Sequence, residues 1–219
     1  MVDPIAPPQQ DRARRTRDKL LTALEALLTE RGFEQIAVAD IAARAGVAVG
    51  SVYSHFKDKT AFLQALLDQR KSLLKARLKA AEQMDAAAQL AAAGGLAPAL
   101  QMIAQSAMAQ VQADAHILRA VYYFARTHPE IDTEEWFALY AKAEAGFGVV
   151  LDVYAGEIMI TDRATALRML SYFFNVIFIE AIMFAEAGLN TVGRMSPDAL
   201  AREAAHMAYG YLITPPSTV

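Results

Sequence analysis

The stretch that decides the fold is VADIAARAGVAVGSVYSH, residues 38–55. Gly46 separates two short segments that we expect to be helices, Val38–Ala45 and Val49–His55. Two short helices that cross at a steep angle need a small side chain where their backbones meet, and Ala42 provides it. The tight turn between them needs a residue that accepts a positive φ, which glycine does without steric cost. The pattern predicts a helix-turn-helix.

Apolar side chains in and before this stretch predict what the helix pair packs against. A preceding helix is expected from about Asp11 to Arg31, with Gly32 ending it and a short connection, Phe33–Ala37, following. Four leucines share one face of that helix: Leu20, Leu24, Leu27 and Leu28. We expect the inward-facing positions of the helix pair to be Ile41, Ala45, Val47 and Val52, with Phe56 also in this core.

The rest of the chain also favours helix, because alanine and leucine supply much of its 55% hydrophobic content and no segment alternates as a half-buried strand would. The alanine-rich stretch Ala86–Leu96 is interpreted as a loose connection. Caps are expected at Thr161 with Asp162, and at Ser196 with Pro197. The sequence therefore predicts an all-α fold of about nine helices, the later ones at Lys59–Met84, Pro98–Gln112, Ala115–Thr127, Thr133–Gly156 (or from Asp132), Thr161–Gly188 and Ser196–Leu212.

Charge divides the chain into two parts. Residues 1–79 hold 14 Lys and Arg against 9 Asp and Glu, a net of +5, whereas residues 80–219 have a net charge of −8. A basic head on an acidic body can bind a polyanion without the body taking part, although solvated surface charge could give the same distribution. We expect a disordered arm at 1–10, a helix-turn-helix domain at 11–58 and a helical domain at 59–219, with helix 59–84 connecting them.

Several classes of protein are disfavoured by what the sequence lacks. There is no cysteine, which excludes disulfides, thiolate metal sites and thiol catalysis. No GxSxG, P-loop or HExxH motif is present, and the four histidines, at 55, 116, 128 and 206, are scattered. We expect no enzymatic activity, no metal and no cofactor.

The ends and the longest apolar run bear on localisation. No apolar segment of a signal peptide follows the N-terminal prolines and arginines. The longest apolar run, Met169–Ala185, is interrupted by Asn175 and Glu180 and is too short to span a membrane. We interpret it as a buried or dimer-interface helix and expect a cytoplasmic protein with no membrane contact.

The run FEQIAVADIAARAGVAVGSVYSHFKDKTAFLQALL, Phe33–Leu67, resembles the DNA-binding domain of the TetR/AcrR (tetracycline-repressor-like) family. Its most specific piece, GSVYSHFKDK at Gly50–Lys59, is similar to the family's G-T-L-Y-x-H-F-x-S-K. The resemblance covers residues 12–70 closely, and the remainder is similar only in being helical and of the expected length. It implies a homodimer whose recognition helices enter successive major grooves of a roughly palindromic DNA operator.

Residue chemistry and the resemblance together give a set of candidate DNA-binding residues. The exposed start of the third helix would face base edges, with Tyr53, His55 and Lys59 around phosphates. An arginine cluster at the start of the first helix would follow the backbone or enter a minor groove. His55 could instead be a packed neutral side chain, and the arginines a solvated helix end. The full set is Arg14, Arg15, Arg17, Ala37, Ala48, Val49, Gly50, Ser51, Tyr53, Ser54, His55 and Lys59.

Three of those positions depart from the family pattern. Ala37 stands where threonine is common, Ala48 lacks the hydroxyl that usually caps the third helix, and Val49 replaces a polar or basic residue. A missing cap costs typically about 1 kcal/mol. Fewer donors would then face the groove, so Val49 is expected to make apolar contact, with weaker or more shape-dependent readout. These departures keep one alternative open, a helical ligand-binding or interaction protein that has lost specific DNA binding.

The acidic part of the chain carries most of the aromatic residues. They could simply fill a helical core, or they could line a cavity for a small hydrophobic or aromatic effector. The last two helices, the first of them apolar nearly all round, are expected to form a four-helix dimer contact. We expect a DNA-binding transcription regulator, a repressor released by its effector, although activation is equally compatible. The candidate ligand-binding residues are Tyr123, Phe124, Tyr140, Phe147, Phe174, Asn175 and Phe178.

Overall fold

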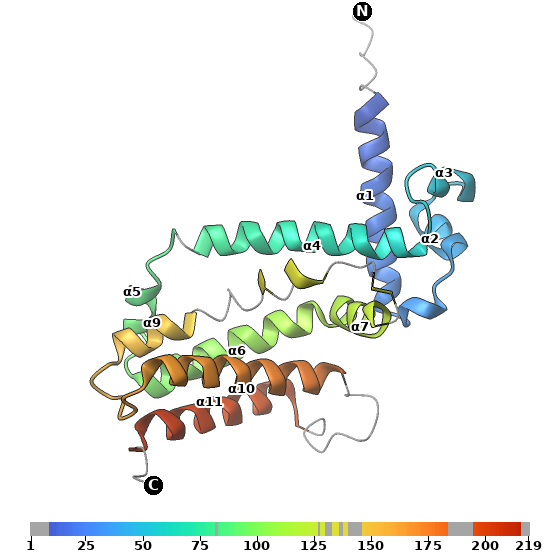
Figure 1. The fold of residues 1–219 in the computed structure, drawn as a ribbon. Helices are drawn as coiled ribbons and strands as arrows, with labels where there is room; N and C mark the ends of the chain where they lie inside the picture. Colours follow the sequence, from blue (N-terminus) through green and yellow to red (C-terminus); the bar gives the residue numbers. More distant parts are fainter. Residues whose placement is uncertain are drawn as a thin grey trace, which may run out of the picture. The chain divides into compact units, whose positions relative to one another are not determined.

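The computed structural model of the chain describes residues 9–81, 83–126, 128–129, 133–135, 138–139, 146–183 and 195–215. Every regular element in those ranges is helical, as predicted (Figure 1). The helices are α1 (Gln9–Leu28), the 3-10 helix η1 (Phe33–Gln35), α2 (Val38–Ala45), α3 (Val49–Tyr53), α4 (Lys59–Ala81), α5 (Ala86–Ala91), α6 (Leu96–Ala113), α7 (Ala115–Ala125), α9 (Gly146–Val153), α10 (Arg163–Met183) and α11 (Pro197–Ile213).

The chain divides into two compact units. The first, the N-terminal unit, takes in residues 1–72 and 116–134, and the second, the C-terminal unit, takes in residues 73–115 and 135–219. Helix α4 contributes residues to both. The predicted domains 11–58 and 59–219 are defined by expected function, and that division stays a prediction.

Helix α1 buries the predicted leucine face, with Leu20 and Leu24 fully inaccessible. It begins at Gln9, inside the segment expected to be disordered, because glutamine and the following Asp11 suit the first turns of a helix. Residues 1–8 lie outside the described part of the chain. The helix ends at Leu28, earlier than expected, and Gly32 has a φ of −62°, so no left-handed glycine terminates it.

The helix-turn-helix forms as predicted. Gly46 adopts φ 67° and ψ 37°, the left-handed conformation, and the next amide, Val47 N, donates to Ala42 O at 3.0 Å. Ile41 and Val52 are fully buried. Two positions expected to point inward, Ala45 and Val47, are only half-buried, because the turn brings them close to its surface.

Aromatic contacts complete the core of the N-terminal unit. Phe56, predicted to be buried, stacks on Phe62 with ring centroids 3.8 Å apart. Phe33 meets Phe124 of α7 edge to face at 4.7 Å. On α4, Phe62, Leu63, Leu66 and Leu67 are buried in the same core.

The C-terminal unit is built on the packing of α6 against α11, with α10 and α9 beside them (Figure 1). Buried alanines such as Ala104 on α6 and Ala201 on α11 let the two backbones approach closely. Helix α11 starts as predicted: the Ser196 hydroxyl accepts from Ala199 N at 3.2 Å, and Pro197 occupies the first turn.

Other elements of the C-terminal unit differ from expectation. The stretch expected to be a loose connection contains α5, whose first turn is capped by the Asp85 carboxylate accepting from Ala88 N at 2.9 Å. Helix α10 is capped by Asp162 rather than Thr161, since Asp162 accepts from Thr165 N at 3.0 Å. Of the helix expected at 133–156, the structure describes α9 as a regular helix. Residues 136–137 and 140–145 lie outside the described residues.

Helix α10 is the one helix in the described ranges that is long and apolar enough, by length and composition, to cross a membrane. Its most apolar window has a mean hydropathy of 1.5, and 33% of that window is buried. The buried stripe includes Ala166, Leu170, Phe174 and Phe178, which pack within the C-terminal unit. A core helix of a globular domain has the same character.

Candidate nucleic-acid interface and ligand cavity

The exposed face of α3 is held out by one buried residue. Val52 is completely inaccessible, which fixes the rotation of the short helix about its axis. Val49, Gly50, Ser51 and Ser54 are consequently exposed, and Tyr53 is 58% exposed. No atom outside the local helix lies within 4 Å of where a Cβ on Gly50 would stand, so another molecule's backbone can approach closely there.

The start of α3 has the polar deficit expected from the sequence. Ala48 makes no side-chain cap, and the Ser54 hydroxyl is used within the helix, donating to Ser51 O at 2.7 Å. Ala37, at the start of α2, is exposed and makes no side-chain cap, while the Asp40 carboxylate accepts from Ala37 N at 3.0 Å. Asp40 also forms an ion pair with Arg31 at 2.7 Å. The ion pair with Arg31 therefore connects α2 to the segment that follows α1, and residue 37 contributes no side-chain cap.

The arginines expected at the interface lie in the first turns of α1. Arg14 and Arg15 are exposed. The Arg17 guanidinium lies over the Phe56 ring at 5.4 Å from its centroid, which is a cation–π contact. Arg17 is therefore oriented by the core of the same unit, whereas Arg14 and Arg15 project from the helix surface.

Lys59 and His55 lie at the end of α3 and the start of α4. The Lys59 ammonium donates to Glu34 O at 3.1 Å and sits 4.6 Å from the Phe33 ring centroid. Partial burial lowers the pKa of Lys59, and the Glu34 carboxylate offsets part of that shift. His55 is half-buried, between the two alternatives left open by the sequence. The bond to the Glu34 carbonyl uses one of the three N–H donors of Lys59, so a phosphate could bind beside it.

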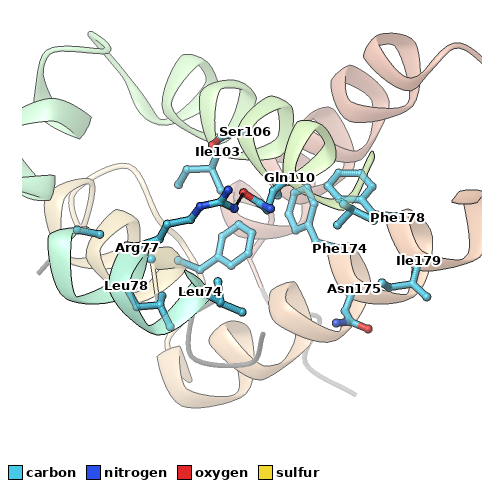
Figure 2. A pocket seen from close by; sticks show the side chains of 15 residues that line it. Leu74, Arg77, Leu78, Ile103, Ser106, Gln110, Phe174, Asn175, Phe178 and Ile179 are labelled. Carbon is cyan, nitrogen blue, oxygen red and sulfur yellow. Dashed lines mark hydrogen bonds between the residues drawn. The ribbon is translucent and has the colours of Figure 1, made fainter. Parts of the chain in front are cut away.

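A second candidate site is a cavity of about 420 Å³ in the C-terminal unit, bounded by α4, α6, α9 and α10 (Figure 2). Its walls are mostly apolar, and Phe147 and Phe174 stack with ring centroids 4.8 Å apart. Cavities of this size and character bind small organic molecules. The lining residues are Leu74, Arg77, Leu78, Ala81, Ile103, Ser106, Ala107, Gln110, Val111, Gly146, Phe147, Phe174, Asn175, Phe178 and Ile179.

Four of the predicted ligand-binding residues come together at this cavity, namely Phe147, Phe174, Asn175 and Phe178. Tyr123 and Phe124 do not line it, since both lie on α7 in the N-terminal unit. Phe124 is instead a packing residue that touches Phe33 and His128, and Tyr123 is largely exposed. The remaining candidate, Tyr140, lies outside the described residues.

The sequence interpretation missed the charged side chain of the cavity, Arg77, and its partner Gln110. Arg77 Nη1 donates to Gln110 Oε1 at 3.0 Å, and Figure 2 shows the Arg77 side chain reaching from α4 toward α6. Arg77 lies in the stripe Leu74–Arg77–Leu78–Ala81, spaced i, i+3, i+4 and i+7, which marks one helix face. An arginine inside such a stripe was the available indication. Among the described residues no cluster of three potential metal ligands occurs.

The structure combines a helix-turn-helix in the N-terminal unit with a cavity in an all-helical C-terminal unit, which is the architecture of a ligand-responsive DNA-binding protein. Residues 20–66 match the family described as "Bacterial regulatory proteins, tetR family". The chain is 41% identical over 59 residues to the HTH-type transcriptional regulator TtgR of Pseudomonas putida. It is 40% identical over 55 residues to the HTH-type transcriptional repressor BepR of Brucella suis biovar 1. Residues 20–66 are therefore similar in sequence to the tetR family of bacterial regulatory proteins.

Each of these sequence matches covers only part of the chain. They cover 27% of this chain and 28% of TtgR, and 25% and 26% for BepR, so the chain aligns with about a quarter of the length of these relatives. The fold as a whole is similar to a putative TetR-family transcriptional regulator from Mesorhizobium loti. That similarity has a TM-score of 0.63 at 19% identity and covers 91% of this chain and 98% of the other.

Proposed function

We propose that the chain is a DNA-binding transcription regulator that works as a homodimer and is released from its operator by a small apolar or aromatic effector. The observation that carries this proposal is the face of α3. A fully buried Val52 and a left-handed Gly46 hold Val49, Gly50, Ser51 and Tyr53 outward on one short helix. Side chains exposed in this way at the start of a second helix are what a recognition helix presents to a major groove.

Contacts to DNA divide into two kinds. Val49, Gly50, Ser51 and Ser54 face base edges in this proposal, Val49 through a thymine methyl and the serines through hydroxyls. Arg14, Arg15 and Arg17 on α1, together with Tyr53, His55 and Lys59, contact phosphates and set the register of the protein on the duplex. Ala48 contributes its backbone amide at the start of α3, and Ala37, whose amide donates to Asp40, contacts DNA through its exposed side chain.

The proposed dimer contact is the outer face of α10 and α11. Apolar side chains remain exposed along both helices, and Met169, Leu170, Phe173, Met207, Ala208 and Tyr211 line a groove between them. Pairing two such faces across a twofold axis gives a four-helix contact. Two recognition helices would then read half-sites of a palindromic operator, about 34–36 Å apart.

The proposed effector site is the cavity of the C-terminal unit. Leu74, Arg77 and Leu78 of α4 line it, and the same helix contributes residues from Lys59 onward to the DNA-binding unit. An effector that changes the packing of α4 therefore acts on a helix that the DNA-binding unit shares. By linkage, effector and operator must weaken each other's binding by the same factor. If the effector-free dimer binds the operator and the effector releases it, the protein is a repressor.

The test is a titration of the full-length protein against labelled genomic fragments at two salt concentrations, read by fluorescence anisotropy. Phosphate contacts release counterions, so we expect the affinity to fall steeply as salt rises. The matched control is the same protein with Ser51→Glu and Tyr53→Glu, which places like charges against the phosphates and should abolish binding. No binding at low salt would overturn the proposal and favour an interaction protein that has lost DNA binding.

A further inference from the structure

The described lining of the cavity in the C-terminal unit carries one charge. Among its described lining residues Arg77 is the only ionisable side chain, and no carboxylate lines the wall. Arg77 is exposed, which places its guanidinium at the mouth of the cavity, whereas Phe147, Phe174 and Phe178 are buried at its base. The cavity therefore has a cationic opening and an apolar, aromatic interior.

Arg77 is held in place by a short polar chain within the C-terminal unit. Its Nη1 donates to Gln110 Oε1 at 3.0 Å, and Gln110 Nε2 donates to Asp114 Oδ2 at 2.7 Å (Figure 2 shows the first contact). Because the amide nitrogen of Gln110 is bonded to Asp114, its carbonyl oxygen is turned toward Arg77. Within the described residues Gln110 is the one hydrogen-bond partner of Arg77, so most of its five N–H donors remain available to a ligand.

The chemistry of this opening selects among possible ligand heads. A planar carboxylate can accept two parallel N–H bonds from a guanidinium, which makes it the best match. An ammonium head would meet a like charge, with no carboxylate among the described lining residues to compensate it. A neutral hydroxyl can bind Arg77, but without the added strength of an ionic hydrogen bond.

The interior selects the body of the ligand. Phe147 and Phe174 stack at 4.8 Å with their planes 21° apart, and Phe174 meets Phe178 at 5.4 Å and 64°. A cluster of ring faces and edges suits an aromatic or extended apolar group. Ile103 and Ile179 complete the apolar wall.

We infer that the cavity binds an amphipathic carboxylate, with its aromatic or aliphatic body among Phe147, Phe174 and Phe178 and its carboxylate paired with Arg77. This inference rests on the proposed function, since it names the chemical class of the proposed effector. The ligand binds the N–H donors of Arg77 that its bond to Gln110 leaves available, beside a hydrogen-bond chain that ends at Asp114, the C-cap of α6. Head and body are both required for tight binding.

The experiment measures binding to the full-length protein by isothermal titration calorimetry in the absence of DNA. The probes are two matched sets that differ only in the head: phenylbutyrate, phenylbutanol and phenylbutylamine, and decanoate, decanol and decylamine. In at least one set we expect the carboxylate to bind roughly tenfold or more tightly than its alcohol, and more tightly than its amine. Arg77→Gln should remove that preference, whereas Arg202→Gln, an exposed arginine on α11 outside the cavity, should keep it.

A charge reversal guards against mere misfolding. Arg77→Glu should lose the carboxylate and gain affinity for the amine of the same set, a gain that an unfolded protein cannot show. Equal binding of all three heads, retained preference in Arg77→Gln, or no carboxylate binding at millimolar concentration would each overturn the inference. DNA binding is measured separately by anisotropy, so a protein that binds operator but shows no carboxylate preference refutes the ligand class and leaves the regulator proposal standing.

Discussion

A single backbone torsion decides whether α2 and α3 can fold against each other. Gly46 has φ 67°, and a Cβ added there would meet no atom within 4 Å, so the penalty for a side chain is torsional and not a clash. The left-handed conformation costs an L-residue roughly 1–2 kcal/mol, partly offset by the lower entropy of the unfolded chain. We expect Gly46→Ala to lower the free energy of unfolding by about 1 kcal/mol, measured by urea denaturation with helical circular dichroism.

The control for that prediction is in the same unit. Gly50 also has open space around its Cβ position but lies inside helix α3 and has no positive φ. Gly50→Ala should therefore leave stability unchanged or slightly raised. If both variants lose the same stability, the left-handed turn is not what the Gly46 substitution disturbs.

The carboxylate that caps α10 gives a pH-dependent prediction. A hydrogen bond from the Thr165 amide, and next one from its hydroxyl, lower the pKa of Asp162 below its usual range. A carboxylate with a lowered pKa contributes stability above the unfolded-state pKa, and the contribution is lost as the pH falls through the folded-state pKa. We expect Asp162→Ala to unfold at lower urea than the wild type at neutral pH, with the difference shrinking toward about pH 3.

Asp162→Asn serves as the companion variant. Its amide oxygen still accepts the Thr165 amide, so the loss at neutral pH should be smaller than in the alanine variant, and the asparagine itself does not titrate. A difference between wild type and Asp162→Ala that stays constant across the whole pH range would show that the ionised cap does not stabilise α10.

At the scale of the helices, the sequence predicted those helix ends that are set by residues within one turn of the end. The predicted end of α2 and start of α11 agree with the structure, because Gly46 ends α2 and Ser196 with Pro197 begins α11 through contacts within one helical turn. Helix α5 was missed because its alanines show no apolar periodicity, and its one indication, Asp85 as a cap, precedes a stretch ending in two glycines. Helix α1 begins at Gln9, two residues before the predicted start, because glutamine and Asp11 are favourable in the first turns of a helix.

The exposed arginines of α1 give a prediction at this scale. Arg14 and Arg15 project from the helix surface, and each phosphate they neutralise should release counterions on binding. We expect the double variant Arg14→Gln, Arg15→Gln to bind operator DNA more weakly and to reduce the slope of log affinity against log salt by about 1 for each arginine in contact. Anisotropy titrations over a salt series measure both quantities.

A matched pair of arginines tests whether net charge alone explains that result. Arg168 on α10 and Arg202 on α11 are also exposed, and both lie in the C-terminal unit. Their double glutamine variant changes the net charge equally but should preserve the salt slope. Identical slopes for the two double variants would mean that Arg14 and Arg15 do not touch phosphate.

At the scale of the whole molecule, sequence reasoning found the aromatic half of the cavity and missed its charged half. Phe147, Phe174 and Phe178 stood out as aromatics in apolar helices, but so did Phe124, which packs in the other unit. Arg77 and Gln110 are 33 positions apart, and helical periodicity gives the face of a residue without naming the helix it meets. The pairing of Arg77 with Gln110 depends on how α4 and α6 pack in the tertiary structure.

The proposed dimer is a property of the whole molecule, and apolar side chains exposed on α10 and α11 are the reason to expect it. The inner stripe of α10 is buried by the C-terminal unit, yet Tyr172 remains 67% exposed on the outside, and Met207 of α11 is 60% exposed. A contiguous apolar surface of this kind is unfavourable in water unless a partner covers it. Because a twofold contact uses the same surface twice, Met207→Glu would bury two unpaired charges and raise the dimer Kd by roughly a hundredfold or more.

Light scattering coupled to gel filtration measures this, and we expect Met207→Glu to elute as a monomer at micromolar concentration. Met159→Glu is the control, since Met159 is 53% exposed in the same unit but lies on neither α10 nor α11. The monomeric variant should also lose operator affinity, because one recognition helix then reaches one half-site without the second. A Met207→Glu protein that stays dimeric would move the twofold contact away from α11, while a monomeric one with undiminished operator affinity would separate DNA binding from dimerisation.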